Sequence, residues 1–354
     1  MVLRLTERVD LAGYTTLRVG GPAARLVETD TADDLILVVR DADLAGELLL
    51  VLGGGSNLVI ADEGFDGTVA RVASAGVAVR QADDLVRITV AAGENWDRLV
   101  EWAVSEKLAG IECLAGIPGL AGATPIQNVG AYGQEVASTI TAVRVFDRHL
   151  GRELTLTPAQ CAFAYRTSVF KVTAGRYVVL DVTFELVREP MSRPIGYAEL
   201  AAMLGVEVGE QAPLADVRDA VLALRRGKGM VLDPDDPDTA SAGSFFTNPV
   251  LDQAQLVTLE RVASARGIKV PRFAADDGRV KVPAGWLIEQ AGFGKGFQGP
   301  GGARISTKHT LALTNHDQAS AADLIGLARQ VAGGVRETFG VELTNEPVLV
   351  GLHL

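Results

Sequence analysis

Residues 116–133, in the middle of the chain, constrain the fold more than any other part of the sequence. They include five glycines and two prolines and almost no charge. Glycine permits a positive φ and a close approach of the backbone to a ligand, and proline stiffens the path between such points. A large, flat and mostly uncharged ligand would suit such a loop, whose neutral polar groups come from Thr124, Gln127, Asn128 and Tyr132. The alternative is a plain cluster of turns, although such clusters are usually shorter and more charged.

A second glycine-rich segment, Gly53-Gly-Gly-Ser-Asn-Leu58, follows the apolar run Leu48–Leu52, which we expect to form a buried strand. Consecutive glycines expose backbone N–H groups that can form a concave nest for phosphate oxygens. The segment lacks the spacing of a dinucleotide-binding GxGxxG motif and the lysine of a P-loop. We therefore predict an anion-binding turn of another kind, with a bulge at the end of the strand as the alternative.

The composition argues against several classes of protein. A chain of 354 residues is long for one domain, so we expect two or three. The net charge of −11 argues against a nucleic-acid partner, which requires a basic face. Two cysteines without a CxxC pair indicate a reducing compartment, and four scattered histidines indicate neither a metal site nor a histidine-based catalytic centre. We find no signal peptide and no apolar stretch long enough to cross a membrane, so we expect a cytoplasmic protein.

Periodicity and capping residues predict an alternation of helices and strands. We expect helices at residues 31–44, 95–109, 214–225, 251–266, 284–291 and 321–339. We expect strands at 142–146 and 178–184, and an apolar strand within 341–351. Asp233–Asp238 is predicted to be a solvated turn, because its prolines and the missing distal glutamate do not suit a calcium loop. Gly294–Gly299 matches GxGxxG but follows a predicted helix instead of a strand, so we reject a dinucleotide site there.

Three side chains are candidates for chemistry. Arg166 has aromatic neighbours and cannot lose its charge, so burial would demand an anionic partner; the alternative is an arginine whose charged end reaches solvent. Ser244 lacks the GxSxG elbow of a triad nucleophile, so it could donate a proton or cap a backbone group. Glu346 precedes a proline in an apolar segment and has either a raised pKa or a place at a strand edge facing water. The basic cluster Arg225–Lys228, at the end of a predicted helix, is explained by the helix dipole.

Taken in order, these motifs resemble the UDP-N-acetylenolpyruvoylglucosamine reductases, flavoenzymes that complete UDP-N-acetylmuramate for bacterial peptidoglycan. The resemblance covers nearly the whole chain. It rests on Thr16-Leu-Arg-Val-Gly-Gly, Gly53-Gly-Gly-Ser-Asn-Leu, Gly116-Ile-Pro-Gly through Gly133, Tyr165-Arg-Thr-Ser168, Gly243-Ser-Phe-Phe-Thr-Asn-Pro249, Ala284-Gly-Trp-Leu-Ile and Glu346.

The resemblance implies an α+β fold, with a two-lobed FAD-binding domain of the vanillyl-alcohol-oxidase (PCMH) type and a C-terminal α+β substrate-binding domain. The implied boundaries are 1–75 for the first FAD-binding lobe, to which the C-terminal strand 341–354 returns, 76–226 for the second lobe, and 227–340 for the UDP-sugar domain. The residues implied at FAD are Gly53, Gly54, Gly55, Ser56, Asn57, Leu58, Gly116, Ile117, Pro118, Gly119, Gly122, Ala123, Thr124, Gln127, Asn128, Gly130, Ala131 and Tyr132.

The resemblance also implies the reaction. NADPH reduces FAD, and the reduced flavin passes a hydride to the vinyl carbon of UDP-N-acetylglucosamine enolpyruvate, which becomes UDP-N-acetylmuramate. Arg166 and Glu346 would stabilise the enolate and Ser244 would protonate it. Tyr197 resembles the tyrosine that lies over the substrate in the first type of the family. The implied substrate-binding residues are Tyr197, Lys228, Asn248 and Arg304.

Two other functions compete with this reductase. One is an FAD oxidase of the same fold, many of which tether the flavin through a histidine; none lies between Met1 and Arg148, so we expect non-covalent FAD. The other is a sugar-nucleotide-binding protein that has lost catalysis, which the presence of Arg166, Ser244 and Glu346 argues against. We further expect a monomer without a metal.

Overall fold

The computed structural model describes residues 3–275 and 278–354, so that parts of the predicted first lobe and substrate domain, residues 1–2 and 276–277, lie outside the described residues. The chain divides into two compact units. The first unit contains the residues up to Val9, Ala23–Gly55 and Asp66–Val231. The second contains Asp10–Pro22, Ser56–Phe65 and Leu232–Leu354.

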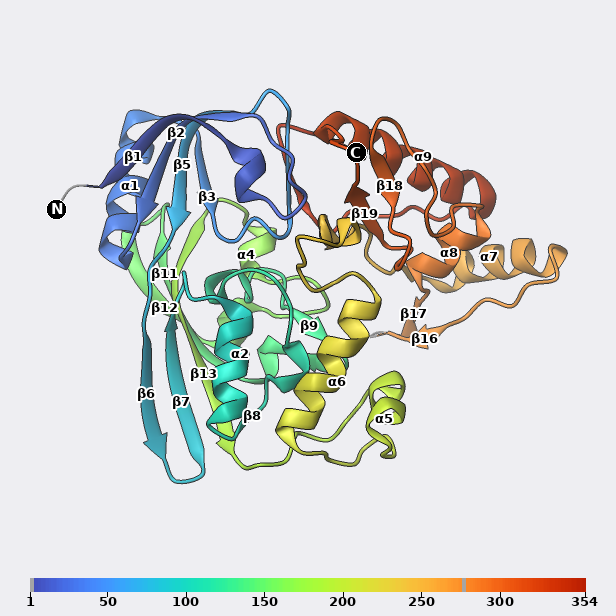
Figure 1. Cartoon of the computed structure of the whole chain (residues 1–354), viewed down its shortest axis with the longest axis horizontal. Helices are drawn as coiled ribbons and strands as arrows, with labels where there is room; N and C mark the ends of the chain where they lie inside the picture. Colours follow the sequence, from blue (N-terminus) through green and yellow to red (C-terminus); the bar gives the residue numbers. More distant parts are fainter. Residues whose placement is uncertain (1–2, 276–277) are drawn as a thin grey trace. The chain divides into compact units, whose positions relative to one another are not determined.

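A four-stranded sheet opens the first unit (Figure 1). Its strands, in spatial order, are β1 (Arg4–Asp10), β2 (Pro22–Thr29), β5 (Phe65–Val72) and β3 (Leu49–Leu52). Helix α1 (Ala32–Ala45) belongs to the same hydrophobic cluster as the sheet and begins where predicted, because the side chain of Thr31 accepts a hydrogen bond from the N–H of Asp34. The prediction of a buried strand at residues 48–52 is wrong at its start: β3 lies at the edge of the sheet and Leu48 is 62% exposed.

A larger antiparallel sheet forms the rest of the framework of this unit. Its strands, in spatial order, are β12 (Arg152–Leu156), β11 (Ile140–Asp147), β13 (Tyr177–Arg188), β7 (Leu85–Ala91) and β6 (Val77–Ala82), with β8 (Leu108–Ala109) also paired to β13. The predicted strands at 142–146 and 178–184 lie within β11 and β13 and are confirmed. Val143 and Val182 lie opposite each other and are both fully buried, so the alternation of apolar residues fixes the register.

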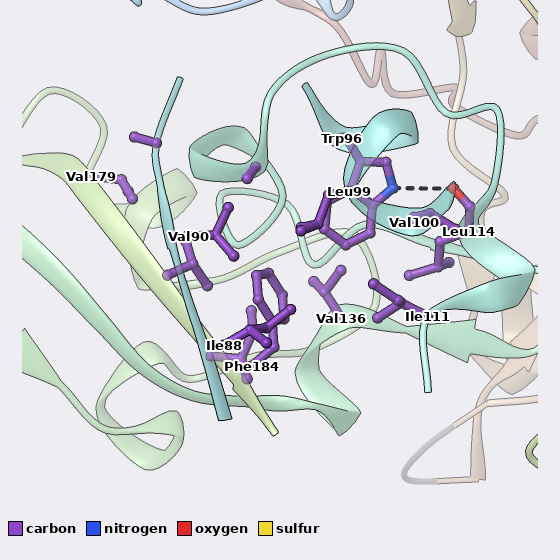
Figure 2. Close-up of a cluster of buried hydrophobic side chains, with 14 of the residues drawn as sticks. Ile88, Val90, Trp96, Leu99, Val100, Ile111, Leu114, Val136, Val179 and Phe184 are labelled. Atoms are coloured by element: carbon purple, nitrogen blue, oxygen red, sulfur yellow. Dashed lines mark hydrogen bonds between the residues drawn. The ribbon is translucent and has the colours of Figure 1, made fainter. Parts of the chain in front are cut away.

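The core of the first unit lies where helix α2 (Trp96–Ser105) packs on this sheet (Figure 2). Trp96 is fully buried, with its ring centroid 5.7 Å from that of Phe184. Its indole N–H donates to the carbonyl oxygen of Leu114 at 3.1 Å, which satisfies the polar group of a buried aromatic side chain. The tryptophan is therefore a packing residue, as the apolar stripe of the helix predicts.

Helix α2 ends earlier than the sequence predicts. The prediction extended to Ala109, but the helix stops at Ser105, and Lys107 adopts a left-handed φ of 59°. Leu108 and Ala109 then form β8, with Ala109 opposite Val187 of β13. Pairing with a distant strand overrides the local helical propensity here.

Helix α6 and several short elements complete the first unit. Helix α6 begins at Leu214 as predicted and ends at Gly227, two residues beyond the predicted Arg225. The remaining pieces are α3 (Pro158–Cys161), α4 (Val169–Val172), α5 (Ala198–Leu204) and the hairpin of β9 (Gly130–Ala131) and β10 (Gln134–Glu135).

Within its described residues, the second unit contains small sheets and three α-helices. Its strands are β14 (Ser241–Ser244), β19 (Ala312–Asn315) and β18 (Ala303–Ile305) in one sheet, β15 (Val250–Leu251), β17 (Val280–Lys281) and β16 (Phe273–Ala274) in another, and the parallel pair β20 (Val348–Val350) and β4 (Leu58–Ile60). The helices α7 (Gln253–Ala265), α8 (Ala284–Gln290) and α9 (Ala321–Phe339) confirm the three predictions in this region to within two residues.

The N-terminus of α9 is held from a distant part of the same unit. Asp62 accepts hydrogen bonds from the N–H groups of Ala321 and Ala322 at 2.8 and 2.9 Å, next to the capping box of Ser320. A carboxylate at this end of a helix accepts hydrogen bonds from backbone N–H groups that have no partner within the helix. Its negative charge is also attracted to the positive end of the helix dipole. The segment from β4 is thereby tied to the longest helix of the unit.

The predictions for two turns in the second unit had different outcomes. Gly294–Gly299 follows α8 and leads to β18, so the absence of a strand before it, which argued against a dinucleotide site, is confirmed. The prediction of a solvated turn at Asp233–Asp238 is wrong for Asp238, which is 3% exposed and accepts a hydrogen bond from the N–H of Thr307 at 2.9 Å. The prolines do form a turn, but its last carboxylate anchors a second loop.

The predicted apolar strand within 341–351 is also shorter than expected, because only Val348–Val350 is a strand. Pro347 has no N–H to contribute to a ladder, and Asn345 instead forms an isolated bridge with Phe246. Among the helices in the described ranges, none is long and apolar enough to span a membrane.

Candidate functional site

The loop at residues 116–133 is fixed in place by backbone contacts with the start of α2 and the end of β7. The N–H of Trp96 donates to the carbonyl of Gly119 at 3.1 Å, and the N–H of Gly122 donates to that of Ala92 at 2.9 Å. A Cβ on Gly122 would lie 2.5 Å from the Cβ of Ala92, so this approach requires glycine. The loop is thus an ordered wall of the first unit.

The two glycine-rich segments touch each other. A Cβ on Gly54 would lie 2.8 Å from the Cα of Gly119, closer than any real side chain allows. Gly55 has a left-handed φ of 60°. In the part of the chain that the structure describes, the N–H groups of Gly54 and Gly55 donate to no protein acceptor. Such a turn can donate to an anion, as the sequence predicts for residues 53–58.

The chain passes from one unit to the other within this segment. Gly53, Gly54 and Gly55 belong to the first unit, whereas Ser56–Leu58 belong to the second. Leu58 begins β4 and lies opposite Val348 of β20. The predicted FAD residues therefore come from both units.

Asn128 braces the loop through its side chain. This residue is 1% exposed, and its amide nitrogen donates to Glu135 Oε2 at 2.7 Å and to the carbonyl of Ala164 at 3.2 Å. Its amide oxygen accepts from the N–H of Ala137 at 3.1 Å. Because these bonds engage both ends of the amide, we expect Asn128 to act mainly by fixing the shape of the loop at residues 116–133.

Arg166 lies against the same loop. Its Nη2 donates to the carbonyl of Gly130 at 2.7 Å, and its guanidinium carbon lies 5.6 Å from the ring centroid of Tyr165. The residue is half-buried and has a left-handed φ of 52°. The structure therefore brings a permanent positive charge to the hairpin of β9. The sequence alone left open whether Arg166 is buried beside an anionic partner or reaches solvent with its charged end.

Ser244 and Glu346 come together in the second unit. Ser244 ends β14, and the N–H of Glu346 donates to the carbonyl of the next residue, Phe245, at 2.8 Å. Both residues are half-buried. Asn57 also donates from its side chain to the carbonyl of Glu346 at 3.4 Å. Segments that lie about a hundred residues apart in the sequence thus place the predicted proton donor and carboxylate on neighbouring backbone.

The four predicted substrate residues fall into two pairs. In the first unit, the ring of Tyr197 lies 5.4 Å from that of Tyr132, above which Lys228 also lies. In the second unit, Asn248 accepts a hydrogen bond from the N–H of Ala284, at the start of α8, at 2.9 Å. Arg304, also in the second unit, donates to Asp317 at 2.9 Å.

Several residues at this wall were missed by sequence reasoning. Asp97 of α2 accepts the N–H of Gly116 at 2.7 Å and so fixes the start of the loop. Arg225, interpreted as a dipole-stabilising residue, donates to the carbonyl of Met230, and burial lowers its pKa to about 10. Glu199 pairs with Lys228 at 2.6 Å. The helix register alone could have placed Asp97 near the loop, whereas the other two contacts depend on tertiary structure.

No metal-binding arrangement occurs within residues 3–275 and 278–354, since no group of three or more histidine, cysteine, aspartate or glutamate side chains could hold an ion. Both cysteines, Cys113 and Cys161, are buried, and burial raises the pKa of each thiol.

Known protein families match two parts of the chain. Residues 23–157 match an FAD binding domain, and residues 235–350 match the C-terminal domain of UDP-N-acetylenolpyruvoylglucosamine reductase. The first match contains the loop with its glycines, and the second contains Ser244 and Glu346. Together they confirm the predicted α+β fold, an FAD-binding domain followed by the C-terminal domain that the second match describes.

Complete relatives are similar along their whole length. A UDP-N-acetylenolpyruvoylglucosamine reductase of Thermobifida fusca is 57% identical over 358 residues, covering 100% of both chains. One from Streptomyces avermitilis is 55% identical over 348 residues, covering 97% of this chain and 94% of the relative. The crystal structure of the enzyme from Thermus caldophilus is 27% identical, covers 99% of this chain and 100% of that chain, and superposes with a TM-score of 0.67. The chain therefore belongs to the UDP-N-acetylenolpyruvoylglucosamine reductase family and is an FAD-dependent oxidoreductase.

Proposed function

We propose that this chain reduces UDP-N-acetylglucosamine enolpyruvate to UDP-N-acetylmuramate, with non-covalent FAD as its cofactor and NADPH as the electron donor. The observation that carries this proposal is the hydrogen bond of 2.7 Å from Arg166 to Gly130. It puts a fixed positive charge at the border of the loop that would line the isoalloxazine. The names of the relatives support the substrate, and the matched domain supports FAD.

The glycine-rich segments fit FAD. The N–H groups of Gly54 and Gly55 have no protein acceptor among the described residues, so they can donate to pyrophosphate oxygens. The uncharged loop at 116–133 would lie along the flavin ring. When bound, FAD would accept a hydride from NADPH and deliver it to the vinyl carbon of the enol ether.

Arg166 and Glu346 would stabilise the charge that this reduction creates. Addition of hydride at the vinyl carbon leaves negative charge on the neighbouring carbon and its carboxylate. The planar guanidinium fork of Arg166 matches the geometry of a carboxylate. Glu346 would act in its protonated form, because an ionised glutamate would repel the same carboxylate.

Ser244 would complete the reaction by protonating the enolate carbon. The O–H bond of the serine breaks, a C–H bond forms, and water then returns a proton to the serine oxygen. Serine is a weak acid, but an enolate is a strong base, so a positioned hydroxyl suffices. The backbone hydrogen bond from Glu346 to Phe245, the residue after Ser244, supports this role because it fixes the backbone at Glu346 and Phe245.

The proposal extends to residues that would hold the sugar nucleotide and to the organisation of the chain. We assign substrate contacts to Tyr197, Lys228, Asn248 and Arg304, and Tyr197 would place the chain in the first type of the family. The proposed lobes are 1–75 with 341–354, 76–226 and 227–340. We propose a cytoplasmic monomer whose flavin is released by acid denaturation, as expected for FAD without a covalent tether.

Anaerobic stopped-flow absorbance at the flavin band tests the two halves of the reaction. NADPH should bleach the flavin, and the enolpyruvyl sugar nucleotide should then restore its colour. Bleaching without recovery would overturn the proposed substrate and favour an oxidase. A protein that cannot be loaded with FAD would overturn the assignment of both glycine-rich segments.

A substitution at Ser244 separates proton donation from the earlier steps. In Ser244→Ala, reduction by NADPH should stay within about twofold of the native rate, while reoxidation by substrate falls by about a hundredfold or more. Ser264→Ala, which changes an exposed serine of α7, is the matched control. Equal losses in both half-reactions would contradict the role of Ser244.

A further inference from the structure

Lys228 has an acidic partner in the first unit that the proposed reaction does not use. Its Nζ lies 2.6 Å from Glu199 Oε2, and the two side chains are 32% and 44% exposed. Glu199 lies in the first turn of α5, and Lys228 directly follows the last residue of α6. Burial works to lower the pKa of Lys228, but the hydrogen bond to Glu199 and the charge interactions with Tyr132, Glu199 and Tyr197 together raise the pKa above its usual value, so the ammonium group stays charged.

Two tyrosines extend this ion pair into a connected group. The ammonium of Lys228 lies 5.6 Å from the ring centroid of Tyr132. The ring of Tyr132 meets that of Tyr197 edge to face, with centroids 5.4 Å apart and an interplanar angle of 89°. We call Glu199, Lys228, Tyr132 and Tyr197 the Lys228 cluster. It links the loop at residues 116–133 to Tyr197, the residue directly before α5.

The cluster presents polar groups at an accessible surface. Tyr197 is 44% exposed, and no side chain caps the start of α5. Tyr132 is half-buried and has a left-handed φ of 49°. A partly exposed ammonium with two nearby phenol groups matches the chemistry of a phosphate oxygen.

Glu199 reduces the attraction of this surface for anions. An exposed ion pair contributes little net stability, because solvent screens it and two long side chains lose freedom. A diphosphate carries more charge than one carboxylate and can therefore replace Glu199 as the partner of the ammonium group. The displaced carboxylate of Glu199 remains nearby, however, and repels the bound diphosphate.

We propose that Glu199 is a built-in competitor that occupies Lys228 in the ligand-free protein and is displaced by the diphosphate group of a nucleotide ligand. Displacement breaks the ionic link between α5 and α6, so α5, with Tyr197 at its start, becomes free to move. This inference rests on the proposed function in one respect, the assignment of Lys228 and Tyr197 to the sugar nucleotide. It makes Glu199 a positioning residue that sets affinity and selectivity for charged ligands.

Titration calorimetry of the FAD-loaded protein with UDP tests the competition. Glu199→Gln should bind UDP about three- to tenfold more tightly than the native protein at low salt, because a like charge is removed. The gain should shrink as sodium chloride rises from about 0.02 M to about 0.5 M. Binding of uridine, which has no phosphate, should not change. Unchanged or weaker UDP binding in Glu199→Gln would overturn the proposal and make Glu199 a support for Lys228.

Two variants control for charge and geometry. Asp219→Asn removes the same charge from an exposed position of α6, and it should leave UDP binding near the native value. Glu199→Asp keeps the charge, so it should also bind like the native protein. If Asp219→Asn gave the same gain as Glu199→Gln, overall charge would explain the effect and the specific competition would be refuted.

Hydrogen exchange provides a readout that a merely structural role would not give. UDP should speed amide exchange in Ala198–Leu204 of the native protein, and Glu199→Gln should show this faster exchange without UDP. Slower exchange of α5 with UDP would overturn the displacement. Turnover of the enolpyruvyl substrate tests the proposed function separately. If the native protein turns over this substrate but Glu199→Gln binds UDP as the native protein does, only the role of Glu199 as a competitor is refuted. If UDP binding changes as predicted but the native protein shows no turnover, only the proposed reaction is refuted.

Discussion

At the scale of single residues, Arg166 is positioned by contacts between distant parts of the sequence. Its guanidinium reaches the carbonyl of Gly130, 36 residues earlier in the chain. Asn128 donates to Ala164 in the same neighbourhood, so the loop and the segment around Arg166 hold each other. The arginine is therefore oriented by the wall that it borders, which is the preorganisation that charge stabilisation requires.

Replacement of this arginine by lysine tests the value of its planar fork. In Arg166→Lys, a single ammonium group cannot both donate to Gly130 and pair in a bidentate way with a carboxylate. We expect kcat/KM for the enolpyruvyl substrate to fall by about a hundred- to a thousandfold, with reduction by NADPH nearly unchanged. Steady-state and single-turnover kinetics measure both quantities. Near-normal turnover would argue against direct contact with the substrate, and Arg80→Lys, at an exposed position of β6, serves as the control.

The types of residue at the site could be predicted from the sequence, but their partners could not. The neutral side chains of the loop and the isolated charge of Arg166 are visible in the sequence as departures from ordinary loop composition. The use of Asn128 as a brace, by contrast, depends on Glu135, Ala137 and Ala164, which only folding assembles. The pair of Glu199 and Lys228 spans 29 residues without a shared helix, so no periodicity indicates it.

At the scale of elements, capping residues predicted helix starts better than propensity predicted helix ends. Thr31 and Asn95 each accept a hydrogen bond at the start of the helix that the sequence assigned to them. The predicted end of α2 was wrong because residues 108–109 pair with β13, and no local sequence pattern indicates that pairing. The chain between the regular elements, including the loop that borders Arg166, was predicted from glycine and proline because those residues act locally.

The contact between the two glycine-rich segments leads to a prediction about Gly54. In Gly54→Ala, the new methyl group would meet the Cα of Gly119 at 2.8 Å, so one segment must move away from the other. We expect flavin content after purification to fall by about tenfold or more, while far-ultraviolet circular dichroism stays native. The matched change Gly227→Ala, at the end of α6 where nothing lies within 4 Å of the added atom, should keep its flavin. Native flavin content in Gly54→Ala would contradict a cofactor site at this contact.

At the scale of the whole molecule, each compact unit has its own hydrophobic core. One cluster includes Trp96 and Phe184 in the first unit, and another includes Phe245, Leu324 and Phe339 in the second. The chain nevertheless passes from one unit to the other at Val9, Pro22, Gly55, Phe65 and Val231. Separate cores on an interleaved chain raise the question of whether the units also unfold separately.

Each unit contains a buried carboxylate whose ionisation couples its stability to pH. In the first unit, the hydrogen bond from Arg176 lowers the pKa of Asp147 despite burial. In the second, burial alone would raise the pKa of Asp238, but hydrogen bonds from the side chain and N–H of Thr307 hold it below its usual value. A carboxyl whose pKa is lowered in the folded state stabilises that state above its unfolded pKa of about 4. This stability is lost as the pH falls through the lower, folded pKa.

These two carboxylates can therefore report on the two units independently. We expect calorimetry of the FAD-free protein to resolve two unfolding transitions, both moving to lower temperature as the pH falls from about 5 to about 3. Asp147→Asn should reduce the pH dependence of one transition, and Asp238→Asn that of the other. Each should also destabilise its own unit at neutral pH by about 1–3 kcal/mol, because donors lose a charged acceptor. A single transition, or two substitutions that move the same one, would show that the interleaved chain makes both cores unfold together.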